Sequence, residues 1–218
     1  MSSDGSTFVQ QNDPAELLEV FDAEGRPTGR AKSRAAVHLD GDWHQAFHCW
    51  IVRRGGEEIV LQRRSLEKDT FPGKWDAAAA GHWRFRESAE QAAREVHEEL
   101  GLQVEFRALR YVGRERLARA FANGLTDREH HQVFVLDDDR ALSEYAPERS
   151  EVIGLAAFTA AGLLQLARGS ISSLTASEAV SVDGDGRLRS ESVTVSRDDL
   201  VPYSSARLRR MLKSVSHG

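Results

Sequence analysis

The chain has 218 residues, of which 40% are hydrophobic and 29% are charged, and its formal net charge is −5. This length and composition fit one globular domain with appendages, and the acidic balance argues against nonspecific binding to nucleic acid or to anionic membranes. The single cysteine, Cys49, excludes an intramolecular disulfide and a cysteine-based zinc site. No apolar stretch is long enough to span a bilayer, and the polar N-terminus lacks a signal-peptide core, so we expect a cytoplasmic protein.

Patterns of apolar residues divide the chain into three parts. Residues 1–16 are polar and predict a disordered tail. Residues 17–168 mix strand and helix patterns, which indicates one α/β or α+β domain with a mixed sheet between helices. Residues 169–218 carry a hairpin signal at Val182–Gly186 and a basic helix, and we expect this extension to pack on the domain. Strands are expected at 17–21, 26–31, 46–52, 58–62, 76–81, 109–117, 132–136 and 152–158, and helices at 88–100, 160–167 and 204–215.

The segment 88–100 is the clearest helix in the sequence. Ser88, followed three residues later by Gln91, forms a capping box, and Gly101 supplies a left-handed stop. The apolar residues of this segment fall within an arc of about 100° on a helical wheel, which predicts one buried face.

Glu95 and Glu99 lie beside this buried face, one turn apart, and Glu98 follows on the same flank. Glu95, Glu98 and Glu99 repel one another at these spacings, and burial at the border of a core increases the cost, so a bound cation is an economical explanation. Carboxylates on one helix face suit Mg²⁺ or Mn²⁺, which also take water and substrate phosphates as ligands. From the charge pattern alone, the alternative is a solvated acidic face.

The residues around these glutamates resemble the Nudix box, G-x5-E-x7-R-E-U-x-E-E-x-G-U, in which U is aliphatic. The segment 94–102 matches its second half at every specified position, and Gly81 and Glu87 precede it. Only six residues separate Glu87 from Arg94, so either the loop before Glu87 is one residue short or Arg86 takes the place of the first glutamate. The resemblance implies the Nudix fold, a mixed β-sheet sandwiched between α-helices.

Further segments resemble the isopentenyl-diphosphate-isomerase-like branch of this superfamily. Together with the box they are specific, whereas any one of them alone would be a weak signal. In the isomerases, basic residues that match Arg34, Arg64 and Lys68 bind the diphosphate, and the resemblance implies the same role here. The segments are residues 38–47, 61–68, 71–76 and 80–82.

The resemblance also implies a metal site that contains histidine. In the isomerases the ligands match His38, His44 and His82, with glutamates that match Glu99 and Glu129. The other interpretation of these histidines is that they are ordinary polar residues around a cleft.

Two more histidines, His130 and His131, follow Glu129 at the start of a strand. Because successive side chains of a strand point to opposite faces, at most one of the two can face a site that Glu129 borders.

The isomerase reaction needs a residue that this sequence lacks. In the isomerases, the resemblance implies, a cysteine and a glutamate that faces it transfer a proton across a double bond. That cysteine comes just before the Gly-His pair, and its position is Ala80 here. Cys49 lies in another strand and is expected in the core. Without the thiol, isomerisation should fail, and the remaining diphosphate site suits attack of water on phosphorus.

We therefore predict a Nudix hydrolase that uses Mg²⁺, or Mn²⁺, to cleave the diphosphate linkage of a nucleoside-diphosphate-type or other small organic substrate. The metal is assigned to Glu95, Glu98 and Glu99, and the catalytic residues are Glu95, Glu99 and Glu129, with Glu95 or Glu129 deprotonating the water. The alternatives are an isomerase-like enzyme and a catalytically weak diphosphate-binding module.

The groups that select the substrate are expected in the loop 119–128 and in the extension after residue 168. The basic face of the last helix is either solvated or a contact for phosphate or for a second copy of the chain in a homodimer. We expect neither nucleic acid nor a membrane as a partner.

Overall fold

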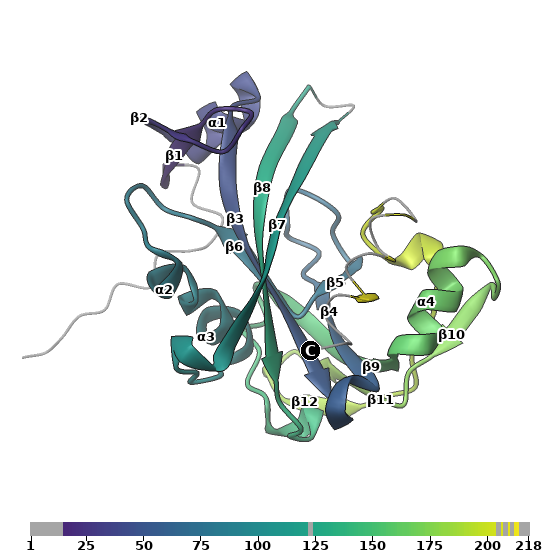
Figure 1. The fold of residues 1–218 in the computed structure, drawn as a ribbon. Helices are drawn as coiled ribbons and strands as arrows, with labels where there is room; N and C mark the ends of the chain where they lie inside the picture. Colours follow the sequence, from purple (N-terminus) through teal and green to yellow (C-terminus); the bar gives the residue numbers. More distant parts are fainter. Residues whose placement is uncertain (1–14, 122–123, 204–205, 207–208, 210–211, 214–218) are drawn as a thin grey trace, which may run out of the picture.

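A computed structural model shows an α+β fold around one large mixed sheet (Figure 1). The structure describes residues 15–121, 124–203, 206, 209, 212 and 213. The helices are α1 (Arg34–Asp40), α2 (Ala89–Ala92), α3 (Arg94–Leu100) and α4 (Ala160–Arg168). The strands of the large sheet are β1 (Leu17–Phe21), β2 (Pro27–Ser33), β3 (Trp43–Arg53), β4 (Glu58–Arg64), β5 (Trp75–Ala77), β6 (Ala79–His82), β7 (Leu109–Ala120), β8 (Thr126–Asp137), β9 (Val152–Thr159), β11 (Glu178–Val182) and β12 (Leu188–Ser190).

The order of the main sheet is β12-β11-β9-β4-β3-β1-β2, while β5 pairs with β4, β6 and β8 pair with β3, and β7 pairs with β8. The β3–β8 pair is parallel, and the other ladders of the described strands are antiparallel. Two short strands, β10 (Ser173–Thr175) and β13 (Thr194–Ser196), form a separate antiparallel pair. Each helix that the structure describes falls short of the length and hydrophobicity needed to cross a membrane.

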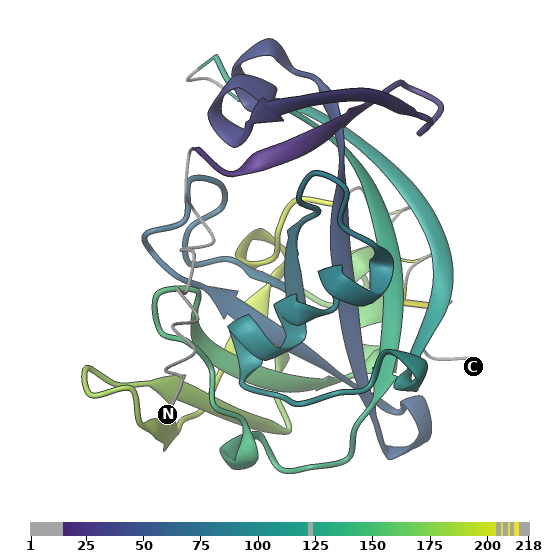
Figure 2. The ribbon, with the colours of Figure 1, turned by 90° about the vertical axis from the view of Figure 1, so that its left-hand side faces the viewer.

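Apolar side chains are buried on both faces of the sheet, because neighbours along a strand alternate between faces. In β3, Phe47, Cys49 and Ile51 pack in the same core cluster as the apolar residues of α3. Trp50 and Val52 pack in the other cluster, which includes the apolar residues of α4. Helices α2 and α3 lie on one side of the sheet and α4 lies on the other (Figures 1 and 2). The predicted mixed sheet between helices is therefore confirmed.

The predicted helix at 88–100 is present but is divided at Ala93. Ser88 and Gln91 form the expected reciprocal capping box, and Gly101 ends the segment with a φ of 70°. Ala93 has a ψ of −9°, far from the roughly −42° of a regular α-helix. Because of this local distortion, α2 ends before Ala93 and α3 begins after it.

Helix α1 was not expected from the sequence. Ser33 caps it by accepting a hydrogen bond from the backbone N–H of Ala36, and Gly41 ends it in the left-handed conformation. Val37 is its one buried residue, so this short segment has no apolar stripe that periodicity could reveal. The helix nevertheless carries Arg34 and His38 one turn apart.

The two ends of the chain differ from the expected division in detail. Residues 1–14 of the predicted tail lie outside the described residues, but Glu16 is buried and lies 2.7 Å from Arg84 Nε. The predicted hairpin is present: β11 and β12 pair around the turn at residues 183–187, and β11 extends the sheet beside β9. The predicted C-terminal helix falls mostly outside the described residues, although Leu212 is helical and packs in the core.

Gly101→Ala should lower the free energy of unfolding more than Gly169→Ala does. Both glycines end helices with a left-handed φ, 70° and 74°, so each variant incurs a steric cost of about 1–2 kcal/mol. A Cβ at residue 101 would also lie 2.6 Å from the carbonyl oxygen of Ala146, whereas nothing lies within 4 Å of a Cβ at residue 169. We expect this overlap to add about 1–3 kcal/mol in urea denaturation. Equal losses in the two variants would contradict the overlap.

Candidate active site

One cleft gathers most of the residues that the sequence assigned to chemistry. Its walls come from α1, the middle of β3, the segment after β4, the end of β6 and the facing ends of β7 and β8. Of the predicted catalytic, metal and substrate residues, Arg34, Arg64, Lys68, Glu95 and Glu129 line the cleft. Glu98 and Glu99 lie behind this lining on α3.

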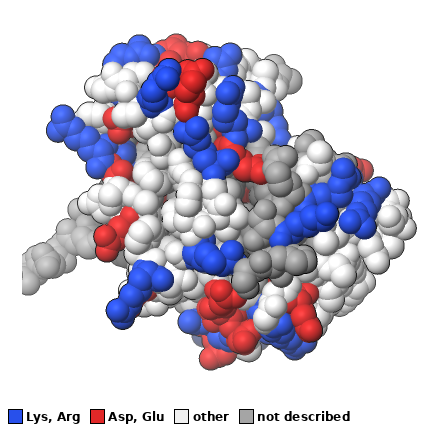
Figure 3. Space-filling view, in the orientation of Figure 1, with Lys and Arg blue, Asp and Glu red and all other residues white. Residues whose placement is uncertain are grey.

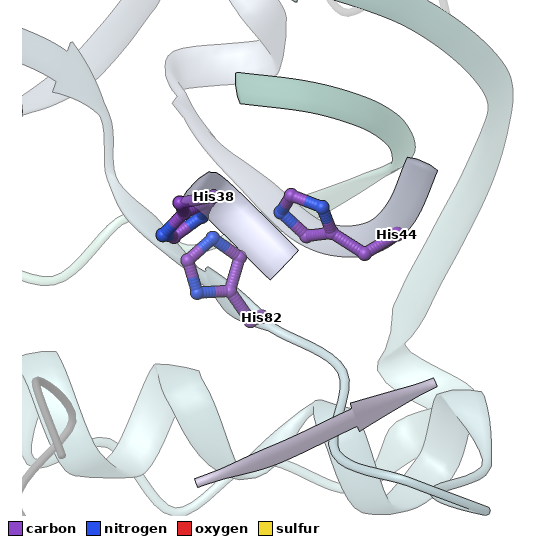
Figure 4. Close-up of side chains that lie close together, drawn as sticks. All are labelled: His38, His44 and His82. Atoms are coloured by element: carbon purple, nitrogen blue, oxygen red, sulfur yellow. The ribbon is translucent and has the colours of Figure 1, made fainter. Parts of the chain in front are cut away.

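Three histidines converge beside the cleft. His38 comes from α1, His44 from the start of β3 and His82 from the end of β6, and Figure 4 shows their rings close together. The ring centroids are 4.9 to 5.2 Å apart. Each residue offers a ligand atom within 4.8 Å of the other two, so the three can hold one metal ion.

Two carboxylates of β8 complete this group. In the parallel register His44 lies opposite Glu129, and its Nε2 atom lies 3.9 Å from Glu129 Oε1 and 3.6 Å from Asp127 Oδ1. His82 Nε2 lies 3.3 Å from the same Glu129 oxygen. Sequence reasoning missed Asp127, although the spacing of Asp127, Glu129 and His131 places all three side chains on one face of a strand.

Burial keeps these imidazoles neutral. It lowers the pKa of His38 to about 4, with help from His44 and Arg34, and it also lowers the pKa values of His44 and His82. Neutral imidazole is the form that binds a metal. Against the effect of burial, His131 and His82 hold the pKa of Glu129 well below its ordinary value.

The donor set fits a divalent cation. His44 Nε2 and Asp127 Oδ1 are buried, and neither has a hydrogen-bond partner among the described residues. Buried polar atoms are normally satisfied, and a cation coordinated by both would satisfy them. Three imidazoles with two carboxylates suit Mn²⁺, Fe²⁺, Co²⁺ or Zn²⁺ better than Mg²⁺, which prefers oxygen ligands.

Of the neighbouring histidines on β8, only His131 lines the cleft. His131 Nε2 lies 2.6 Å from Glu129 Oε2, whereas His130 contacts the backbone carbonyl of Asp22 and stacks on Trp43. This difference confirms the alternation predicted from the sequence.

The helical glutamates are arranged differently from the predicted metal site. Glu95 and Glu98 both accept hydrogen bonds from Arg94 Nη1, at 2.5 and 2.7 Å. Glu99 accepts from the backbone N–H of Ala80 at 2.9 Å. Within the part of the chain that the structure describes, these three carboxylates do not form a group with ligand atoms within 4.8 Å. A Mg²⁺ ion shared by all three therefore stays a prediction.

Close packing explains the glycine that opens the box. A Cβ on Gly81 would lie 2.1 Å from the carboxyl carbon of Glu95, so the Glu95 carboxylate rests directly on the backbone of β6. Burial raises the pKa of Glu95 well above its ordinary value. Its Oε2 atom is buried without a hydrogen-bond partner among the residues described.

Glu87 contacts Arg94 across the short spacing of the box. Glu87 accepts from Arg94 Nε at 2.8 Å and from the backbone N–H of Arg84 at 2.8 Å. Arg86 is exposed, so it does not take the place of the first glutamate. The expectation that Arg86 takes this place was therefore wrong, whereas the shortened loop before Glu87 stays a prediction.

The three predicted diphosphate ligands, Arg34, Arg64 and Lys68, line the cleft together. Arg64 donates to the carbonyl oxygen of Thr70 at 3.0 Å, and its Nη1 atom lies 3.6 Å from Asp76. Elsewhere, on the face drawn in Figure 3, basic and acidic side chains of the described residues are interspersed. In the cleft itself these three cations lie among acidic side chains, Asp76 and Glu129 included.

The other end of the cleft is largely apolar, and its residues come from segments that the sequence analysis singled out without naming the side chains. Phe71 and Phe121 lie with ring centroids 5.5 Å apart, and the Arg119 guanidinium lies 4.5 Å from the Phe71 centroid. Val201 and Tyr203 reach this end from the C-terminal extension. Parts of both predicted substrate-selecting segments therefore lie on the cleft.

Comparisons with known proteins agree with the resemblance to the Nudix box and with the mixed sheet of the fold. Residues 42–175 match the NUDIX domain family. The chain is 34% identical over 203 residues to a protein described as an uncharacterized Nudix hydrolase of Clostridium acetobutylicum, covering 92% of this chain and 97% of that protein. This chain belongs to the Nudix family.

Two further comparisons concern a sequence relative of the Nudix chain and a solved structure with its fold. It is 35% identical over 146 residues to an isopentenyl-diphosphate delta-isomerase of Mycolicibacterium vanbaalenii, covering 66% of this chain and 77% of the isomerase. The crystal structure of DR0079 from Deinococcus radiodurans shares the fold, with a TM-score of 0.50 and 23% identity over 71% of this chain and 89% of that chain. The resemblance to the isomerase-like branch is therefore confirmed.

The cysteine of this Nudix chain lies away from the cleft, as expected. Cys49 is fully buried in the core beside Phe47 and Ile51. Burial raises the pKa of its thiol to about 12. Ala80, which stands at the position of the isomerase cysteine, lines the cleft.

His82→Gln should weaken binding of Mn²⁺ or Co²⁺ by about 10-fold or more, because it removes one imidazole nitrogen from the group formed with His38 and His44. Isothermal titration calorimetry on the full chain measures the change. His97→Gln is the matched control, since His97 is exposed on α3 outside the cleft. Equal affinities for the wild type and His82→Gln would remove this histidine from the metal site.

Proposed function

We propose that this Nudix protein is a divalent-metal-dependent hydrolase of small organic diphosphates. The observation that carries the proposal is the juxtaposition, in one cleft, of a histidine–carboxylate metal group with three cations. A bound divalent cation would polarise a phosphoryl oxygen and lower the pKa of a bound water molecule. His38, His44, His82, Asp127 and Glu129 would hold it.

The cations bind and orient the diphosphate. Arg64 is fixed by Thr70 and Asp76, which limits the rotamer entropy lost when it binds an oxyanion. Lys68 lies between Glu99, at 3.5 Å, and Glu151. These contacts hold the positive charges in place before the substrate arrives, which favours charge stabilisation in the transition state.

We assign acceptance of the water proton to Glu95. Its Oε2 atom is buried at the cleft without a hydrogen-bond partner in the described chain, and the raised pKa makes this carboxylate a stronger base than an exposed one. Glu129, the other candidate, is occupied by His82 and His131, which favours a role in holding the metal.

The relationship to isomerases makes double-bond isomerisation the second candidate. Two features oppose it: Ala80 offers no proton, and the Cys49 thiol is buried outside the cleft with a pKa of about 12. An acid and a base must lie within hydrogen-bond reach of the substrate carbon on opposite faces.

A panel of organic diphosphates incubated with Mg²⁺, Mn²⁺ or Co²⁺ tests the proposal, with hydrolysis followed by ³¹P NMR. Metal-dependent turnover supports the hydrolase. Isopentenyl diphosphate in D₂O belongs to the same panel, and deuterium incorporation or an isomerised product would replace the hydrolase by the isomerase. Binding without turnover would leave a diphosphate-binding module and refute both activities.

Arg64→Ala should lower kcat/KM for every diphosphate that is turned over, by about 10-fold or more, because a charge-assisted contact to phosphate is lost. Arg63→Ala is the matched control. Arg63 is the neighbouring residue on β4 and is exposed, so its side chain lies away from the cleft. An unchanged kcat/KM in Arg64→Ala would place the diphosphate elsewhere.

Glu95→Gln should lower kcat by at least about 10²-fold, because it removes the base while keeping the shape of the side chain. Metal content measured on the same sample distinguishes loss of the base from loss of the metal. Glu90→Gln, an exposed change on α2, serves as the control. If Glu95→Gln keeps its kcat, the proton goes to another group.

A further inference from the structure

A second group of potential metal ligands lies beside the first. His48, Glu129 and His131 offer ligand atoms within 4.8 Å of one another. All three side chains are buried, with 5%, 8% and 1% of their residue surfaces exposed. This group shares Glu129 with the group that contains His44 and Asp127.

The two oxygens of Glu129 are directed to different groups. Oε1 lies 3.3 Å from His82 Nε2 and 3.9 Å from His44 Nε2, whereas Oε2 lies 2.6 Å from His131 Nε2. In two-metal sites the ions lie about 3.5–4 Å apart. A carboxylate with one oxygen toward each ligand group is placed to bridge such a pair.

Strand pairing fixes the two histidines of the second group. Ala46 pairs with His131 in the parallel β3–β8 ladder, and His48 follows two residues later on the same face of β3. The imidazole rings stack, with centroids 3.8 Å apart and planes 19° from parallel. On its other side His48 pairs with Ala80 of β6, and both residues line the cleft.

An ion pair between His131 and Glu129 explains the position of His131 alone. The imidazole of His48 stacks on that of His131 and also lies within ligand distance of the same carboxylate. A group of two imidazoles and one carboxylate with access to a cleft is a common ligand set for catalytic metals.

We infer that His48, Glu129 and His131 bind a second divalent transition-metal ion, with Glu129 bridging it to the ion held by His38, His44 and His82. The centre is then binuclear. Because two of the second ion's ligands are imidazoles, it belongs to the Mn²⁺ to Zn²⁺ series and not to Mg²⁺.

Equilibrium dialysis of the full chain against Co²⁺, followed by metal analysis, tests this inference without any substrate. We expect two Co²⁺ per chain in the wild type and one in His48→Gln and in His131→Gln. His97→Gln, the exposed control on α3, should keep two. One Co²⁺ in the wild type, or two retained in both His48→Gln and His131→Gln, would overturn the second site.

Electron paramagnetic resonance of the Mn²⁺-loaded wild type keeps the inference testable if the variants fail to fold. A carboxylate-bridged pair gives an exchange-coupled spectrum, and only uncoupled Mn²⁺ signals would refute the bridge. Both experiments are independent of turnover. If the chain binds one metal ion and hydrolyses diphosphates, the second site is refuted and the proposed function stands. If it binds two ions and hydrolyses none, the proposed function is refuted and the second site stands.

Discussion

The site depends on the parallel pairing of β3 with β8 in a sheet whose other described ladders are antiparallel. This register sets His44 opposite Glu129, and every second residue of the two strands then shares one face. Farther along the same face, Trp50 and Val135 belong to the core that α4 covers. One face of two adjacent strands therefore changes from a packed core to a polar cleft, so the rigid core fixes where the ligand atoms lie.

The buried carboxylates around this face need positively charged partners, and these come from several elements. Arg94 contacts two carboxylates of its own helix and Glu87, and desolvation of these acids without such a partner would be costly. Lys68 does the same for Glu99 and Glu151. The carboxylates of Asp127 and Glu129 lie beside imidazoles from α1, β3, β6 and β8. A bound cation is what would balance the remaining negative charge.

The sequence predicted what is local and missed what depends on distant pairing. Helix caps, the glycine stop at 101 and the cluster of cations follow from short-range rules or from the family resemblance. The ligand pairs His44–Asp127 and His48–His131 join residues about 80 positions apart, and no local pattern states which strands pair or in which direction. The division of the helix at Ala93 also escaped prediction, because the capping signals at both of its ends are regular.

The C-terminal extension is tied to the cleft through a polar chain. The Tyr203 hydroxyl donates to Asp76 Oδ1 at 2.9 Å, and the other oxygen of Asp76 lies 3.6 Å from Arg64. Arg119 donates to the carbonyl oxygen of Pro202 at 2.8 Å while its guanidinium covers Phe71. The same short segment thus supports a proposed diphosphate ligand and walls the apolar end, which couples the orientation of the phosphates to the shape available for the organic group.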